Sequence, residues 1–272
     1  MNGHPVLTPL ADATDPAGYG GKAAQLAGAL GHALPVPGGF ALAWTAVNAT
    51  VAGDPDAHHG LAGLERGPWA VRSSAIGEDS AAASFAGAHL SVLGVVGSGA
   101  VLEAIGRVHA SASDPSASAY RDRLSLESED PRMAVVIQQM VAADVAGVMF
   151  TRNPVTGVRE RVIEASWGLG ESVVSGMVTP DQYRLGQDGR FLDRTAGEKD
   201  VALRLRPDGS VEEVAIAAEH VESFCLDEHH LTALHELATA CDRAFGCTEH
   251  DIEFAFVGAT PFLLQRRPIT HG

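Results

Sequence analysis

The sequence is poor in cysteine and in positive charge. Its three cysteines, Cys225, Cys241 and Cys247, form no C-x-x-C pair, which argues against a zinc site or a disulfide framework. Acidic residues number 34 and basic residues 19, so the formal net charge is −15 at pH 7. This excess disfavours a surface that binds nucleic acid or an anionic membrane, although a nucleotide needs only a local basic pocket.

Long hydrophobic runs are also missing. No stretch of about 18 apolar residues is present to span a membrane, and the first residues lack the charged and apolar regions of a secretion signal. We therefore expect a cytoplasmic protein.

What remains is an ordinary globular composition. Hydrophobic residues make up 46% and charged residues 19% of the 272 residues, which suits one two-lobed domain or two small ones. We predict an α+β fold in two lobes, with a boundary near Pro131 that separates residues 1–130 from residues 131–272. Helices are expected at residues 21–30, 101–109, 116–124 and 228–245, and strands at residues 40–44, 69–73, 89–96, 133–141, 146–151 and 161–165.

Local signals place several turns and caps. Asp227 is the expected N-cap of the long helix that runs through Phe245, and Asp188-Gly189 and Asp208-Gly209 predict two hairpin turns. The adjacent histidine pairs, His58-His59 and His229-His230, are expected in a loop and at a helix start.

The end of the chain predicts another β-hairpin. Residues 251–256 and 261–268 are rich in β-formers and flank a short segment that contains Gly258. If the turn centres near Ala259, Glu253 lies opposite Gln265 and Asp251 lies opposite Arg267. Because successive strand residues point to opposite faces, these four side chains share one face. The other face is then apolar and is expected to pack into a core; it holds Ile252, Phe254, Phe256, Phe262 and Leu264.

The polar face of this hairpin has the chemistry of a metal and phosphate site. Carboxylate and amide oxygens, as in Glu253 and Gln265, are hard ligands that suit Mg²⁺. The guanidinium fork of Arg267 suits phosphate oxygens. The other interpretation is a solvated face with one cross-strand ion pair, and the hairpin alone does not decide between the two.

Five earlier segments give weaker signals. Gly20-Gly21-Lys22 opens a helix, where an anion is favoured. Arg72-Ser73-Ser74 follows a strand, and residues 84–87 are small enough for a mobile cover over phosphates. Residues 138–141 end a buried strand whose backbone groups can meet an adenine edge. Residues 164–171 combine glycines with glutamates that can face a cation. None of these segments is decisive by itself, and a purely structural role is the simpler interpretation of the Arg72-Ser73-Ser74 segment and of residues 84–87.

Taken together and in this order, the motifs resemble one family. They are GGKAAQL, VPGGFAL, AVRSSAIGEDSAAASFAG, AVVIQQMV, GVMFTRNPVTG, EASWGLGESVVSG, PDQY, DIEFAF and LLQRRPIT. They look like the N-terminal nucleotide-binding region that phosphoenolpyruvate synthase shares with pyruvate phosphate dikinase and the rifampicin phosphotransferases. The resemblance covers nearly the whole chain. It implies an ATP-grasp fold that holds Mg·ATP in a cleft between two lobes.

The resemblance also implies roles for individual residues. Phosphates would be contacted by Lys22, Arg72 and by Arg121 of the Tyr120-Arg121 pair. The phosphates would be covered by the loop of Ser84, Phe85, Ala86 and Gly87. The adenine pocket would be lined by Gln139, Met140 and Val141, and Glu164 is assigned to the same ATP site. Magnesium would be held by Glu253 and Gln265. The catalytic set would be Lys22, Arg121 and Arg267, with Arg267 stabilising charge on the transferring group.

One departure from the family limits what can be said of the substrate. Larger members continue into a swivelling domain with a phosphocarrier histidine and a further domain for pyruvate or a drug, and no carrier-histidine motif occurs here. By resemblance we expect a stand-alone phosphotransferase that splits ATP to AMP and phosphate and passes the β-phosphoryl group to a small-molecule acceptor. The alternatives are a subunit of a split synthase or dikinase that phosphorylates a histidine on a partner protein, a non-catalytic ATP-binding regulatory subunit, or a carboxylate-activating ligase.

Overall fold

The computed structural model describes residues 6–77, 90–112 and 132–269, which fall into two compact units. The first unit comprises residues 1–28, 38–140 and 270–272, and the second comprises residues 29–37 and 141–269. The strand at residues 133–139 therefore belongs to the first unit, while the expected boundary between functional lobes at residue 131 stays a prediction. No helix in the described ranges is long and apolar enough to cross a membrane.

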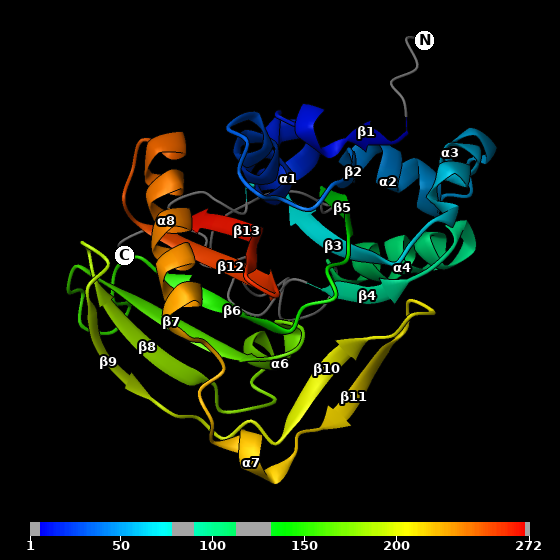
Figure 1. Ribbon diagram of the computed structural model, residues 1–272. Coiled ribbons are helices and arrows are strands. Elements are labelled where there is room, and N and C mark those ends of the chain that lie inside the picture. Colours follow the sequence, from blue (N-terminus) through cyan, green and yellow to red (C-terminus); the bar gives the residue numbers. More distant parts are fainter. Residues whose placement is uncertain (1–5, 78–89, 113–131, 270–272) are drawn as a thin grey trace. The chain divides into compact units, whose positions relative to one another are not determined.

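The first unit is built on a five-stranded antiparallel sheet with the strand order β1-β2-β5-β3-β4 (Figure 1). Its strands are Thr8–Pro9 (β1), Gly39–Leu42 (β2), Trp69–Ala75 (β3), Ser91–Val95 (β4) and Met133–Gln139 (β5). Its helices are Pro16–Gly31 (α1, whose last three residues belong to the second unit), Trp44–Val51 (α2), Pro55–Gly60 (α3) and Ser98–Ser111 (α4), with 3-10 turns at Leu10–Asp12 and Ala62–Glu65. One hydrophobic core joins β3, β5, α2 and α4.

The second unit holds a six-stranded antiparallel sheet with the order β13-β12-β6-β7-β8-β9. Its strands are Val145–Phe150 (β6), Glu160–Trp167 (β7), Asp181–Gly186 (β8), Phe191–Thr195 (β9), His250–Val257 (β12) and Thr260–Pro268 (β13). Val201–Leu205 (β10) and Val211–Ala215 (β11) pair separately. The helices are Glu171–Val174 (α6), Ala218–Val221 (α7) and Glu228–Phe245 (α8).

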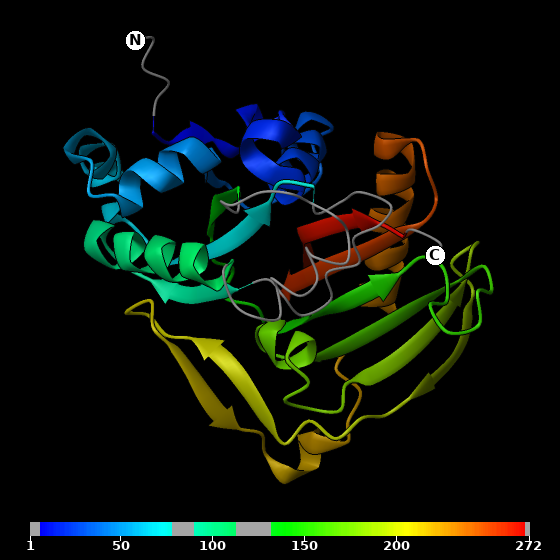
Figure 2. The same ribbon diagram turned by 180° about the vertical axis from the view of Figure 1, so that it is seen from behind.

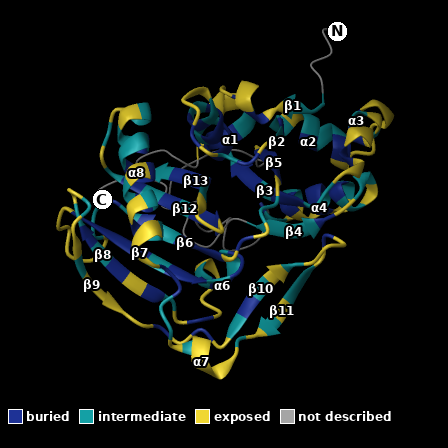
Figure 3. Cartoon of the chain, viewed as in Figure 1, coloured by how far each residue is buried: buried dark blue, intermediate teal, exposed yellow. Residues whose placement is uncertain are grey.

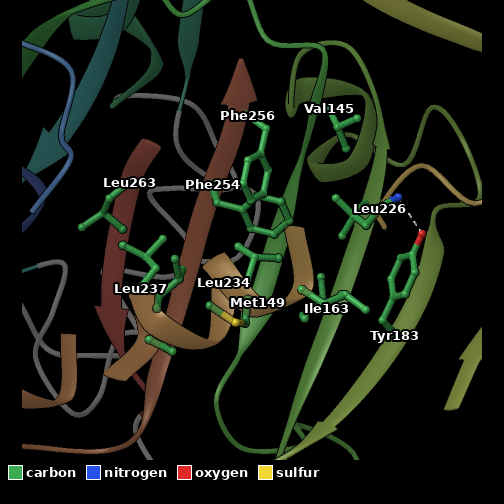
Figure 4. Close-up of a cluster of buried hydrophobic side chains, with 14 of the residues drawn as sticks. Val145, Met149, Ile163, Tyr183, Leu226, Leu234, Leu237, Phe254, Phe256 and Leu263 are labelled. Atoms are coloured by element: carbon green, nitrogen blue, oxygen red, sulfur yellow. Dashed lines mark hydrogen bonds between the residues drawn. The ribbon is translucent and has the colours of Figure 1, made fainter. Parts of the chain in front are cut away.

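Helix α8 covers one face of the six-stranded sheet, in front in Figure 1 and behind the sheet in Figure 2. Leu234 of α8 packs with Met149, Ile163 and Phe254 (Figure 4), and Tyr183 closes the edge of the core by accepting a hydrogen bond from the Leu226 backbone at 2.9 Å. The outward side of α8 is exposed (Figure 3). The long helix and its Asp227 cap are confirmed, because the Asp227 carboxylate accepts from His230 N at 3.0 Å.

The terminal hairpin is confirmed, but its apolar face differs from the prediction. The turn pairs Val257 with Thr260, and a β-bulge between Glu253 and Phe254 leaves Leu264 as the additional residue of β13. Leu263 is therefore the fully buried core residue, whereas Phe262 and Leu264 are only half-buried. The bulge restores the expected register beyond it, so that Glu253 pairs with Gln265 and Asp251 with Arg267.

Other segments depart from the predictions in smaller ways. The strand expected to reach Trp44 ends at Leu42, and α2 begins at Trp44. His58-His59 lies in the short helix α3, capped by Asp54, and not in a loop. Both hairpin turns, at Asp188-Gly189 and Asp208-Gly209, join paired strands as predicted. The helix expected at residues 116–124 lies outside the described residues.

Candidate active site

The sheet of the second unit places the predicted metal ligands in one cross-strand row. Gln265 of β13 pairs with Glu253 of β12, Glu253 with Val148 of β6, and Val148 with Glu164 of β7. Side chains directly opposite each other share a face of the sheet. The structure therefore brings Glu253, Gln265 and Glu164 onto the same face, which is the face turned away from α8. Gln182 of β8 continues the row and donates to Glu164 Oε1 at 3.5 Å.

The donor set of this row fits magnesium better than zinc. Glu253 is half-buried and Gln265 is 5% exposed, and both project from paired strands of the sheet. The described residues contain no group of three or more His, Cys, Asp or Glu side chains arranged around a metal position. Mg²⁺ is usually held by one or two carboxylates together with waters and substrate phosphates, so a small, oxygen-only set suffices.

The adjacent row holds the predicted arginine. Arg267 Nη2 donates to Asp251 Oδ2 at 2.9 Å across β12 and β13. Burial raises the pKa of Asp251, as does the neighbouring Glu253, while Arg267 opposes the rise. The ion pair fixes one side of the guanidinium. Arg267 lies two residues from Gln265 on the same strand, so it shares a face with the predicted metal ligands.

In the first unit, the structure brings Lys22 next to the β3 segment that carries Arg72. The Lys22 side chain is 4% exposed, and its Nζ donates to the Ser73 carbonyl oxygen at 2.7 Å. Arg72 Nη1 lies 3.5 Å from Gln138 Oε1. Two cationic side chains that are 50 residues apart in the sequence thus meet at β3: Arg72 belongs to this strand, and Lys22 is hydrogen-bonded to its backbone.

The predicted adenine segment is partly engaged in the fold. Gln139 N donates to Gly38 O at 2.8 Å, and Met140 N donates to Pro68 O at 3.1 Å. Met140 Sδ also accepts from Gly94 N at 2.9 Å. Both of these backbone N–H groups are therefore engaged within the first unit, and the adenine pocket stays a prediction. The predicted phosphate cover (residues 84–87) and Arg121 lie outside the described residues.

The roles assigned from the sequence left out three residues of these surroundings, although Ser74 and Gln138 lie in segments that gave weak signals. Gln138, on β5, is 3% exposed, and its Nε2 has no hydrogen-bond partner within the described ranges. Gln182 extends the acidic row. Ser74 contacts the backbone on both sides of Lys22. Strand alternation in β3 and β5 indicates Ser74 and Gln138, because both lie on the same face of the first sheet as Arg72. The residues assigned to the adenine pocket, however, began at Gln139.

Comparison with known proteins now decides the family. The protein-family model for the AMP/ATP-binding domain of pyruvate phosphate dikinase matches residues 56–272 of the sequence. The chain belongs to this family. As a dikinase-type AMP/ATP-binding domain, it carries a nucleotide-binding module, and the resemblance drawn from its motifs is confirmed.

Relatives of this dikinase-type domain are much longer proteins. A probable phosphoenolpyruvate synthase from Methanothermobacter thermautotrophicus is 39% identical over 202 residues, which is 74% of this chain and 29% of the relative. Rifampicin phosphotransferases from Streptomyces sviceus and Bacillus subtilis are 39% and 33% identical over 207 residues, which is 76% of this chain and 24% of each relative. The chain thus spans roughly a quarter of the length of these relatives.

Proposed function

We propose that this chain is an ATP-grasp module that binds Mg·ATP and transfers a phosphoryl group from it. The observation that carries the proposal is the row formed by Gln265, Glu253 and Glu164 on one face of the sheet, beside Arg267. Oxygen ligands next to a guanidinium suit a magnesium-bound triphosphate. The membership in a family of AMP/ATP-binding domains supports it.

Each residue then has a defined task. Glu253 and Gln265 would hold magnesium, which supplies charge neutralisation at the phosphate oxygens. Lys22 would bind phosphate oxygens through its ammonium group, which acts as a point charge, and Arg72 would bind them through two N–H donors of its planar guanidinium. Arg267, oriented by Asp251, would stabilise charge that develops on the transferring group.

We further propose that ATP is split to AMP and phosphate, with the β-phosphoryl group passing to a small-molecule acceptor. The names of the relatives support only the small-molecule part of this proposal, because phosphoenolpyruvate synthase and rifampicin phosphotransferase both name small-molecule products or acceptors. The alternative acceptor is a histidine on a partner protein.

Calorimetry with ATP, with and without magnesium, tests the binding step. Wild-type protein should bind ATP more tightly with magnesium. Glu253→Gln keeps the side-chain shape but removes the charge, so it should abolish most of the magnesium-dependent gain. Glu213→Gln, at an exposed position of β11, is the matched control and should bind like wild type. Absence of ATP binding by wild-type protein in both conditions would refute the proposal.

The products are tested separately by ³¹P resonance during turnover with candidate acceptors. AMP, phosphate and a phosphorylated acceptor should rise together. ADP as the sole nucleotide product would show γ-phosphoryl transfer and would contradict the dikinase-type reaction.

A further inference from the structure

The segment that carries Lys22 has an interrupted helix. Gly20 sits inside α1 with φ 79° and ψ 167°, which is not helical, so the regular helix restarts at Gly21 and places Lys22 in its first turn. The first N–H groups of a helix have no intrahelical acceptor. An external group must satisfy them or leave them to water.

Ser74 of β3 supplies that group from 51 residues away in the sequence. Its Oγ accepts from Ala23 N at 3.1 Å and donates to Tyr19 O at 2.7 Å. One hydroxyl therefore bonds the backbone on both sides of the kink, immediately around Lys22. Ser74 is fully buried, so water does not compete for these bonds.

Gly20 makes this contact possible. A Cβ at position 20 would lie 2.2 Å from the Ser74 carbonyl oxygen and 2.5 Å from its Oγ. The positive φ and the close approach both require glycine. Lys22 Nζ also donates to Ser73 O at 2.7 Å. With the two hydrogen bonds of Ser74 Oγ, three hydrogen bonds therefore attach residues 19–23 to residues 73–74.

The alternation of β3 links this attachment to the second cation. Arg72 and Ser74 are two residues apart and so lie on the same face of the strand. Ser73 points to the opposite face, with the core residues Trp69 and Val71. The hydroxyl that holds the Lys22 segment is therefore on the face that presents Arg72.

We propose that Ser74 is a positioning residue for ATP binding: its hydroxyl, admitted by Gly20, holds Lys22 in place relative to Arg72 so that both contact the phosphates. The inference rests on the proposed role of Lys22. A hydroxyl that served only as a helix cap would change stability without changing affinity for the phosphates in particular.

A double-mutant cycle on the whole chain separates the two roles. Calorimetry gives the affinity for Mg·ATP, and displacement of ATP gives the affinity for adenosine, which lacks phosphates. Ser74→Ala, which removes both hydrogen bonds of this hydroxyl, should weaken ATP binding roughly five- to tenfold and leave adenosine binding unchanged. In a Lys22→Ala background, Ser74→Ala should have no further effect, because coupled residues are not additive.

Two further variants guard against a simple folding defect. Gly20→Ala should reproduce the selective loss by pushing the Lys22 segment away from Ser74. Ser172→Ala removes an equally buried hydroxyl, which donates to Leu169 O at 3.0 Å in the second unit, and should bind ATP like wild type. If Ser74→Ala does not fold, Ser74→Cys replaces it in the cycle, with a smaller effect of the same sign.

The outcomes distinguish the two proposals. If wild type fails to bind ATP, or if Lys22→Ala binds it normally, the proposed function of this site is wrong. If Lys22→Ala weakens ATP binding, three results for Ser74→Ala would show that the positioning role is wrong. Ser74→Ala could leave ATP binding unchanged, or it could weaken the binding of ATP and of adenosine equally. Its effect on ATP binding could also add fully to that of Lys22→Ala in the double variant.

Discussion

At the residue scale, the pair of Asp251 and Arg267 makes a prediction about catalysis. The carboxylate holds Nη2 of the guanidinium at 2.9 Å, which leaves the planar fork in a fixed orientation. Arg267→Lys would keep the charge but lose the fork. With a phosphoryl acceptor present, kcat should fall by more than KM rises, because such contacts strengthen as charge develops. Initial-rate measurements over a range of ATP concentrations check this, and an unchanged kcat would remove the assigned role.

A second prediction at this scale concerns the buried His250, which lies on the core face of β12. Arg266 Nε donates to His250 Nδ1 at 2.9 Å, while Nε2 lies 3.1 Å from Asp242 Oδ1 without good hydrogen-bond geometry. Burial, together with Arg266, lowers the pKa of His250 to about 4, although Asp242 opposes the shift. The ring is therefore neutral in the folded protein at neutral pH.

Stability should consequently fall as the pH drops below about 6.5. In the window from about 6.5 down to about 4, the unfolded state binds a proton at His250 that the folded state does not. The free energy of unfolding is thus unaffected above this window and decreases by up to about 3 kcal/mol across it. Denaturant titrations at several pH values measure the slope. His250→Gln should flatten it, and an equal slope in that variant would assign the proton elsewhere.

At the scale of elements, α8 depends on its cap. The Asp227 carboxylate accepts from His230 N, and Asp227 N donates to His230 Nδ1 at 3.3 Å, which forms a capping box. Asp227→Ala should cost about 1 kcal/mol of stability. Thr232→Ala, which removes a hydroxyl bonded to Glu228 O four residues earlier in the same helix, should be nearly neutral. Thermal unfolding of both variants tests the difference, and equal effects would contradict a specific capping role.

The elements also show how far the sequence predicts the site. Strand alternation and a short turn were enough to pair Glu253 with Gln265 and Asp251 with Arg267. The bulge was not predictable, because Leu263 and Leu264 are identical side chains and either can face the core. The β-branched residues of α2 favour a strand locally, but Val47 is buried in the core as part of a helix. The hydrogen bonds of Ser74 with Tyr19 and Ala23 join residues that are far apart in the sequence, so no local sequence pattern predicts them.

At the scale of the whole molecule, residues 29–37 belong to the second unit although they are surrounded in sequence by the first. Ala29 and Leu34 are part of the second core, and Pro35 O accepts from Leu263 N at 2.9 Å. Leu34→Ala should lower the free energy of unfolding by about 2–3 kcal/mol, near the low end for a buried leucine. His32→Ala, at an exposed position close by, should change it by less than about 0.5 kcal/mol. Denaturant titration compares them, and equal effects would show that the segment does not contribute to that core.

This shared segment has a consequence for the order in which a ribosome delivers the chain. The first unit can assemble its sheet once residue 139 has emerged, since β5 is its central strand. Leu34 and Val36 are then already synthesised but still lack the core partners they pack against, and Pro35 lacks Leu263 until β13 has been synthesised. The nascent chain therefore carries an apolar segment whose partner Leu263 is missing until β13 has been synthesised. Until β13 has been synthesised, residues 29–37 would therefore be accessible to a co-translational chaperone.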